Sequence, residues 1–292
     1  MNGKSFVRVE APAKVNLYLH VTGLRDDGFH ELDSLVVFAD VHDLITCKKG
    51  SGLTLKLSGP ESASLRKASG TNIVLRAAKA LADKVGPKKV TGVEIHLEKF
   101  LPVAAGIGGG STDAAATLKA LCEFWDVNLS QREISELAQF LGADVAVCVE
   151  GRSSFFSGIG DKIDPINNFP KLSMLLVNPG IELLTSKIFK ARKGSYTQIA
   201  RLRRIPIDSM MFFDEIKKRT NDLEATAIIM APVIKQVLSN ISSSPGCKIS
   251  RMSGSGATCF GLFDNKVQAK KAALELRKMN PNWWIVATES RL

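Results

Sequence analysis

The feature that most constrains the fold is a glycine-rich segment between a predicted strand and a predicted helix. Residues 93–102 alternate apolar and polar, and residues 111–125 are rich in alanine with a helical period. Four of the five residues at 106–110 are glycine, which allows positive φ and close approach to a ligand. A helix N-terminus adds unpaired N–H groups and partial positive charge. The segment therefore predicts a phosphate site; the alternative is a tight structural turn with Ser111 or Thr112 as the helix cap.

Two common phosphate-binding motifs do not fit this segment. A Walker A loop requires a lysine, and none occurs between positions 102 and 118. The dinucleotide motif G-x-G-x-x-G, started at Gly106 and Gly108, would need its third glycine where Ser111 stands. The P-loop and dinucleotide folds therefore lose support.

Composition narrows the class of protein. The 292 residues carry 39 Lys and Arg against 29 Asp and Glu, a formal net charge of +10. Such an excess attracts anionic ligands (nucleotides, diphosphates or nucleic acid), or it reflects a basic surface without a specific partner. No run of 18 apolar residues and no apolar signal segment occur, so we expect a cytoplasmic protein with no membrane partner. Five cysteines without C-x-x-C spacing and four scattered histidines predict neither a disulfide framework nor a metal site.

Periodicity predicts two domains of mixed α and β structure. We expect strands over 7–23, 32–41, 44–49, 53–59, 93–102, 145–151, 153–158, 172–180 and 283–290, two more around a glycine turn in 246–263, and helices over 72–86, 111–125, 129–141 and 267–279. Residues 209–240 are largely helical, with interruptions at 221–224 and Pro232. Asp, Asn and Pro concentrate at 160–170, which predicts domains over 1–165 and 166–292.

Three segments together resemble the GHMP kinase superfamily, which includes galactokinase, homoserine kinase and mevalonate kinase. Residues 102–115 resemble its phosphate-binding motif, residues 11–23 its N-terminal motif and residues 252–263 its C-terminal glycine motif. The resemblance implies an α+β, two-domain GHMP kinase fold, with a ribosomal-protein-like α+β domain followed by a ferredoxin-like α/β sandwich. It also implies an ATP-dependent small-molecule kinase.

Further segments resemble one branch, the 4-diphosphocytidyl-2-C-methyl-D-erythritol kinases of the non-mevalonate isoprenoid pathway. They are residues 12–32, 142–151, 177–180 and 221–224. The sequence Gly-Phe-His-Glu-Leu ending at Leu32 discriminates best, because other superfamily members lack it. The resemblance implies phosphorylation of the 2-hydroxyl of the erythritol moiety, with a cytidine-diphosphate-linked alcohol and ATP as partners and no nucleic acid.

The resemblance implies that Asp144 and Lys14 are catalytic. Asp144, expected where a helix ends and a strand begins, would orient or deprotonate the attacking hydroxyl, or else only cap the helix. Lys14 would lie beside Asp144 or contact the transferring phosphoryl group, unless it is a solvated strand lysine. At about 4 Å and an effective dielectric of about 20, such a pair is worth roughly 4 kcal/mol before desolvation. Ala146 and Cys148 replace the usual proline and aromatic residue, which affects local packing.

Residues in four further segments are predicted to bind the acceptor substrate. Asn16 lies two residues after Lys14, on the same strand face, and would donate to the substrate hydroxyl or to Asp144. The second glycine turn would approach the substrate or the phosphates, or form a plain hairpin; its residues are Ser253, Gly254, Ser255 and Gly256.

Phe29, His30 and Phe189 are the predicted cytosine contacts. Phe29 and His30 resemble the family's base-binding pair: a ring stacked on a base contributes about 1–3 kcal/mol, and His30 would hydrogen-bond the pyrimidine edge. Relatives often carry Tyr at position 29, so a hydroxyl contact is lost here while stacking remains. Phe189 would cover the opposite face of the base, or belong to the core.

The predicted cofactors are ATP and Mg²⁺. Asn72 and Lys99 match positions near the adenosine in the family. Ser111 is the best candidate Mg²⁺ ligand, with Thr112 as an alternative, and ATP and water would supply most other ligands. The residues predicted to hold the phosphates are Pro102, Val103, Ala104, Ala105, Gly106, Ile107, Gly108, Gly109, Gly110, Ser111 and Thr112.

Two alternatives remain open at this point. The first is another GHMP small-molecule kinase, acting on homoserine or mevalonate, which would keep the glycine loop but not prefer a cytidine diphosphate. The second is a basic RNA- or nucleotide-binding module without catalysis, for which we expect steeply salt-dependent RNA binding and no ATP turnover.

Overall fold

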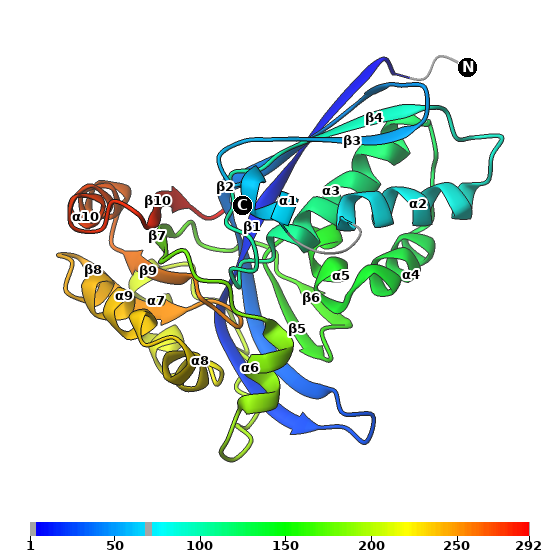
Figure 1. The fold of residues 1–292 in the computed structure, drawn as a ribbon. Helices are drawn as coiled ribbons and strands as arrows, with labels where there is room; N and C mark the ends of the chain where they lie inside the picture. The colour runs from blue at the N-terminus through cyan, green and yellow to red at the C-terminus, as the bar shows by residue number, and fades with distance from the viewer. Residues whose placement is uncertain (1–3, 68–71, 292) are drawn as a thin grey trace. The chain divides into compact units, whose positions relative to one another are not determined.

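Two long strands pass through both compact parts of the molecule. The computed structural model describes residues 4–67 and 72–291. Unit 1 comprises 1–13, 42–103 and 108–151, and unit 2 comprises 14–41, 104–107 and 152–292. Strands β1 (Phe6–Leu24) and β2 (His30–Lys49) contribute to both units (Figure 1). The units are therefore not continuous stretches of chain, whereas the predicted domains are; the boundary at residue 165 stays a prediction.

Unit 1 combines part of a sheet with a group of helices. Strands β3 (Leu53–Ser58) and β4 (Val93–Glu98) are parallel, and β4 pairs antiparallel with the C-terminal part of β2. Helices α1 (Ser62–Lys67) and α2 (Ile73–Val85) connect β3 to β4, and α3 (Gly109–Phe124), α4 (Gln131–Leu141) and α5 (Ala143–Glu150) follow. Figure 1 shows α2 to α5 as one group, with α2 and α5 both against α3. Alanines on α3 allow this close packing.

Local signals predicted the ends of several helices correctly. Ser130 Oγ accepts the Glu133 N–H, and the Glu133 carboxylate accepts the Ser130 N–H, so the capping box at the start of α4 is confirmed. Helix α2 ends at Gly86, which has a φ of 79°.

The strand predicted over 145–151 is wrong, because residues 145–150 belong to α5 and Gly151 is its C-cap residue. The pattern Val-Ala-Val-Cys-Val favours a strand by propensity. The helix nevertheless buries Val145, Val147 and Cys148 and packs on α3 and α4. Burial against neighbouring helices therefore outweighs β-propensity in this segment.

Strand β2 is continuous where two strands were predicted. His42 and Asp43 interrupt the apolar pattern, yet both lie within β2. Asp43 is fully buried and its carboxylate accepts the N–H groups of Phe100 and Leu101. The charged side chain therefore has partners inside the fold and does not end the strand.

Unit 2 is built on a four-stranded antiparallel sheet in the order β10-β7-β9-β8. Its strands are β7 (Ser173–Asn178), β8 (Cys247–Met252), β9 (Cys259–Phe263) and β10 (Trp284–Glu289). Helices α9 (Val233–Ser242) and α10 (Lys266–Met279) both pack on it (Figure 1). The order β7, α9, β8, β9, α10, β10 is the ferredoxin-like arrangement expected for this part of the chain.

The remaining elements of unit 2 lie outside this four-stranded sheet. They are β5 (Ser154–Gly158), β6 (Lys162–Pro165), α6 (Thr185–Ala191), α7 (Ser209–Lys217) and α8 (Glu224–Met230). Strand β5 pairs with the N-terminal part of β2 and with β6, which lies in the segment where the domain boundary was predicted. The core joins Leu19 and Val21 of β1 with residues of β7, α8, α9 and α10.

Candidate active site

The first half of the glycine loop is held by backbone contacts within unit 2. The Lys14 N–H donates to Ile107 O at 2.9 Å, and the Thr258 N–H donates to Ala105 O at 3.0 Å. The Ser253 hydroxyl donates to Gly106 O at 3.0 Å. The N-terminal strand, the glycine loop and the C-terminal glycine turn are therefore in direct contact, although they are far apart in the sequence.

Gly106 and Gly254 make this contact possible. Both have positive φ, 73° and 54°. A Cβ on Gly106 would overlap the carbonyl of Ser253 and lie 2.6 Å from the nitrogen of Gly256, and a Cβ on Gly254 would lie 2.6 Å from Gly106 O. Each glycine motif therefore leaves room for the backbone of the other, and the turn at 253–256 is more than a plain hairpin.

The second half of the loop forms the N-terminus of α3. Gly108 is the N-cap residue, in the left-handed conformation with a φ of 64°, and no side chain caps the helix within the described chain. Gly109, Gly110 and Ser111 form its first turn. The Thr112 hydroxyl donates to the carbonyls of Gly108 and Gly109 at 3.2 and 3.0 Å. The alternative in which Ser111 or Thr112 caps the helix is therefore wrong.

The two residues predicted near the adenosine have structural partners in unit 1. Asn72 Oδ1 accepts the Val74 N–H at 2.9 Å and so caps α2. Lys99 is 1% exposed, and its ammonium contacts the carboxylates of Asp43 and Asp113. The location of Asn72 and Lys99 beside a nucleotide stays a prediction.

Charges around Lys99 interact strongly because they are buried. Burial alone would lower the pKa of Lys99, but Asp113 and Asp43 outweigh it and raise that pKa. Burial raises the pKa of Asp113 to about 7; Lys99 opposes this shift and Asp43 adds to it. Lys99 therefore stays charged at neutral pH.

The two predicted catalytic residues lie in different units. Lys14 is buried in β1 at 3% exposure, with its Nζ 5.8 Å from the ring centroid of Phe156, so it is not a solvated strand lysine. Asp144 is an exposed residue in the first turn of α5, after Gly142. It begins a helix rather than a strand, which corrects its expected local structure. A meeting of the two side chains stays a prediction.

Asn16 lies two residues after Lys14 and is also buried. Its N–H donates to Ser253 Oγ at 3.0 Å, and its Nδ2 donates to Ser34 Oγ at 2.9 Å. Its Oδ1 is buried without a hydrogen-bond partner among the described residues. Asn16 was predicted to donate, but the atom without a partner is an acceptor.

The predicted base-binding residues form a group in unit 2. The rings of His30 and Phe189 have centroids 5.1 Å apart, so the structure brings together two residues that are 159 positions apart. Burial, with a smaller contribution from Arg192, lowers the pKa of His30. Phe29 is 58% exposed. Phe189 packs partly against the core of unit 2, so both readings of that residue have support.

The second glycine turn contacts α6 through its remaining residues. Ser255 Oγ lies 2.8 Å from the hydroxyl oxygen of Thr185. Gly256 has a φ of 84° and donates its N–H to Ser253 O at 3.0 Å. The turn is therefore connected to the glycine loop on one side and to α6 on the other.

Comparison with known proteins identifies the family. The model described as "GHMP kinases N terminal domain" matches residues 72–152, and that described as "GHMP kinases C terminal" matches residues 201–282. The 4-diphosphocytidyl-2-C-methyl-D-erythritol kinases of Rhodospirillum rubrum and Paramagnetospirillum magneticum are 46% and 44% identical to the chain. These matches cover 95% and 96% of this chain and 90% and 97% of the relatives. The chain belongs to the 4-diphosphocytidyl-2-C-methyl-D-erythritol kinase family.

Solved structures agree with this GHMP kinase assignment. The crystal structure of a 4-(cytidine 5'-diphospho)-2C-methyl-D-erythritol kinase matches 98% of this chain and 100% of that chain, with a TM-score of 0.77 at 29% identity. Homoserine kinase from Cytophaga hutchinsonii matches 99% and 95%, with a TM-score of 0.72 at 18% identity, which shows the fold alone. The two-domain GHMP kinase fold is confirmed, and the chain is an ATP-dependent small-molecule kinase.

The Asn-Asp-Leu-Glu segment of this kinase, residues 221–224, makes contacts that no sequence pattern predicted. Asn221 Nδ2 donates to Met252 O and Gly254 O, both at 2.8 Å. The Glu224 carboxylate accepts the Met252 N–H at 2.8 Å. Asp222 accepts the Val21 N–H of β1 at 2.8 Å. The segment therefore holds both β1 and the second glycine turn.

Replacing Asn221 with Ala should destabilise the kinase by about 2 kcal/mol, because two buried carbonyls lose their donor. The free energy of unfolding in urea measures this effect. Ser250→Ala in β8 is the matched control, since its hydroxyl donates to a single carbonyl, that of Leu238. Equal losses in the two variants would contradict the role assigned to Asn221.

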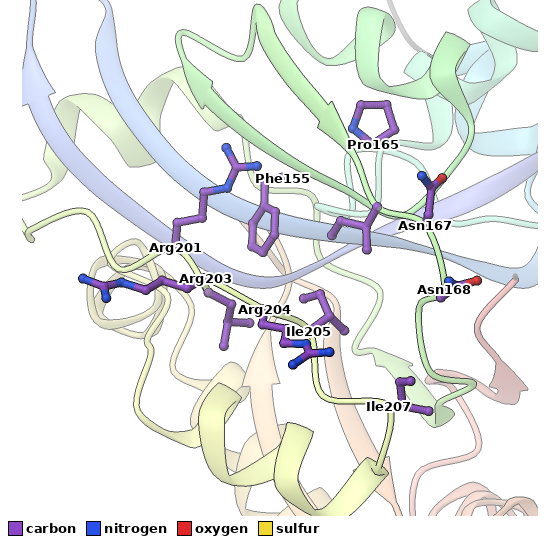
Figure 2. A pocket seen from close by; sticks show the side chains of 11 residues that line it. Phe155, Pro165, Asn167, Asn168, Arg201, Arg203, Arg204, Ile205 and Ile207 are labelled. Atoms are coloured by element: carbon purple, nitrogen blue, oxygen red, sulfur yellow. The ribbon is translucent and has the colours of Figure 1, made fainter.

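A pocket of about 560 Å³ in unit 2 contains none of the predicted site residues. Figure 2 shows it beside Phe155 and Pro165, with Arg203 pointing away from both. Arg201 forms an ion pair with Asp164 and lies 4.5 Å from the ring centroid of Phe155. The charge of Arg201 is thus already balanced within the kinase.

Neither a metal-binding group nor a membrane-spanning helix is found among the described residues. No group of three or more His, Cys, Asp or Glu side chains there is arranged to hold a metal ion. Likewise, no helix in that part of the chain combines the length and apolar character needed to cross a bilayer.

Proposed function

We propose that this kinase transfers the γ-phosphoryl group of ATP to the 2-hydroxyl of 4-diphosphocytidyl-2-C-methyl-D-erythritol, in the non-mevalonate isoprenoid pathway. The observation that carries the proposal is the contact between His30 and Phe189, with ring centroids 5.1 Å apart. It places an aromatic ring beside the histidine of the branch-specific loop, in a chain whose near-full-length relatives carry this substrate in their names.

The glycine loop supports phosphate binding. The start of α3 offers backbone N–H groups from Gly109, Gly110 and Ser111, and the helix dipole favours negative charge there. Phosphoryl transfer depends mainly on positioning and on neutralising charge. Asp144 would orient or deprotonate the acceptor hydroxyl, and Lys14 would supply positive charge.

The donor set at the loop fits an Mg²⁺ ion that binds together with the nucleotide. Ser111 lies half-buried in the first turn of α3 and is the proposed protein ligand. The Thr112 hydroxyl is already bonded to backbone carbonyls and is the weaker candidate. Since the described residues hold no carboxylate cage, most ligands would come from ATP and water. When bound, Mg²⁺ neutralises charge on the β- and γ-phosphates.

The residues proposed to bind the acceptor can supply the contacts that cytosine and a substrate hydroxyl require. Because burial and Arg192 lower the pKa of His30, its ring is neutral at pH 7 and offers one donor and one acceptor to a pyrimidine edge. The exposed ring of Phe29 is accessible for stacking. The buried Asn16 Oδ1 would accept a hydrogen bond from a substrate hydroxyl.

An assay of ADP release tests the proposal. Turnover should be greatest with the cytidine-diphosphate-linked alcohol and near background with homoserine or mevalonate. A preference for homoserine or mevalonate would overturn the proposed substrate and would indicate a GHMP kinase of different specificity.

Replacing Phe29 with Ala should raise KM for the cytidine substrate by about 10- to 100-fold, because a stacked ring contributes about 1–3 kcal/mol. KM for ATP should be unchanged. Phe140→Ala, which removes another exposed ring on α4, is the control and should leave both constants unchanged. A rise in KM for ATP alone would mean that the two ligand sites are assigned the wrong way round.

A further inference from the structure

Three charged side chains lie buried beneath the two ends of the 102–112 loop, in unit 1. Lys99 Nζ is 2.5 Å from Asp43 Oδ2 and 2.6 Å from Asp113 Oδ2, and each side chain is at most 3% exposed. We call these residues the lysine cluster. None of them had a predicted role in shaping the loop.

The cluster holds residues 99–101, which follow the end of β4 at Glu98 and lead into the loop. Asp43 Oδ1 accepts the N–H groups of Phe100 at 2.5 Å and Leu101 at 2.9 Å. The backbone of Lys99 is itself fixed, since its N–H donates to Ser58 O at 2.8 Å and its carbonyl accepts the Glu61 N–H at 3.1 Å. The chain is therefore held at the three residues that precede Pro102.

The same ammonium also holds the helix that leaves the loop. Asp113 lies on α3, and its Oδ2 contacts Lys99 Nζ. A Cβ on Gly109 would lie 3.2 Å from that nitrogen, so the ammonium lies against the first residue of the helix. Asp113 Oδ1 is buried without a hydrogen-bond partner in the described chain. Its salt bridge to Lys99 therefore ties the helix to the end of the strand.

A buried cluster of this kind is poorly explained by stability alone. Removing charges from water is costly, and apolar side chains of similar volume often stabilise a fold equally well. One ammonium shared by two carboxylates fixes the positions of the two carboxylates relative to each other. Here that geometry sets the distance between Leu101, three residues after the end of β4, and the helix start at Gly109.

We propose that Asp43, Lys99 and Asp113 are positioning residues that hold both ends of the 102–112 loop in the conformation that binds the phosphates of ATP. The inference rests on the proposed function for ATP binding at this loop. The cluster acts through the backbone, and it leaves the acceptor site and the phosphoryl transfer step unchanged.

The test compares Asp113→Ala with Asp113→Asn. Alanine removes the tie between helix and strand, so KM for ATP should rise about 10-fold or more, with kcat and KM for the acceptor within about twofold of wild type. Asparagine keeps an oxygen for the lysine and should restore KM for ATP to within about threefold of wild type. Thr117→Val removes a buried hydroxyl one turn further along α3 and should change neither KM.

Hydrogen exchange of residues 102–112 supplies a readout that does not depend on turnover. Without nucleotide, these amides should exchange faster in Asp113→Ala than in wild type or Thr117→Val. If Asp113→Ala does not fold, the triple variant Asp43→Asn, Lys99→Met, Asp113→Leu replaces it, because it removes the buried charges together. If the variant that folds shows the same amide exchange and the same KM for ATP as wild type, the proposal is overturned.

Failure of the proposed function gives a different result. If ATP does not protect residues 102–112 from exchange in the wild-type protein, the nucleotide binds elsewhere and the proposed ATP site at this loop is wrong. If ATP protects the loop in wild type and the variants bind ATP equally well, only the inference about the lysine cluster is overturned.

Discussion

Replacing Asp144 with Asn should lower kcat by about 10²- to 10⁴-fold while leaving the affinity for ATP close to wild type. A positioned carboxylate that orients or accepts a proton contributes a factor of this size. Asn has nearly the same shape but cannot accept the proton. Because Asp144 is exposed at the start of α5, the substitution should not disturb the fold. Steady-state kinetics and calorimetric titration with ATP measure the two quantities.

A matched control separates this effect from a general loss of negative charge. Asp83 is exposed on α2, also in unit 1, and Asp83→Asn should leave kcat unchanged. A kcat near wild type for Asp144→Asn would remove Asp144 from the mechanism. A parallel loss of ATP affinity would mean instead that Asp144 contributes to nucleotide binding.

Replacing Gly106 with Ala should raise KM for ATP by roughly 100-fold, because a misplaced binding loop loses about that factor. The new Cβ would overlap the Ser253 carbonyl and lie 2.6 Å from the nitrogen of Gly256. The carbonyl of Ser253 and the nitrogen of Gly256 are backbone atoms of the second glycine turn, which Asn221 holds by two hydrogen bonds. The loop and the turn must therefore separate.

Gly180→Ala isolates the effect of backbone conformation. Gly180 has a φ of 79°, close to the 73° of Gly106, but no atom lies within 4 Å of a Cβ built there. We expect Gly180→Ala to cost about 1–2 kcal/mol of stability, as a left-handed alanine does, without any change in KM for ATP. Equal values of KM for ATP in the two alanine variants would show that contact between the glycine motifs does not shape the loop.

The local features of the site could be predicted from short stretches of sequence. Glycines at 106–110 before an alanine-rich run specify a turn and a helix start. Gly106 and Gly108 have positive φ, which glycine adopts without strain. Ser130 and Glu133 specify the start of α4 by reciprocal hydrogen bonds. Such signals depend on neighbours within a few residues.

Segment 143–150 shows where local reasoning fails. Its β-branched residues favour a strand, yet α5 forms because Val145, Val147 and Cys148 are buried against α3 and α4. The ion pairs of Lys99 could not be predicted from the sequence, for another reason. Its partners Asp43 and Asp113 are 56 and 14 residues away, and no local pattern links them. An aspartate within the alanine-rich face of α3 was the one available signal.

The sequence by itself determined the kinds of chemistry present: a glycine-rich turn before a helix, a lysine and an asparagine on one strand face, and an aromatic–histidine loop. Only the tertiary structure decided which of these meet. It joined the two glycine motifs through Gly106 and Gly254, brought His30 to Phe189, and buried Lys99 between two carboxylates. The physical reason is range: backbone conformation and capping depend on adjacent residues, whereas burial and ion pairing depend on segments that only folding brings together.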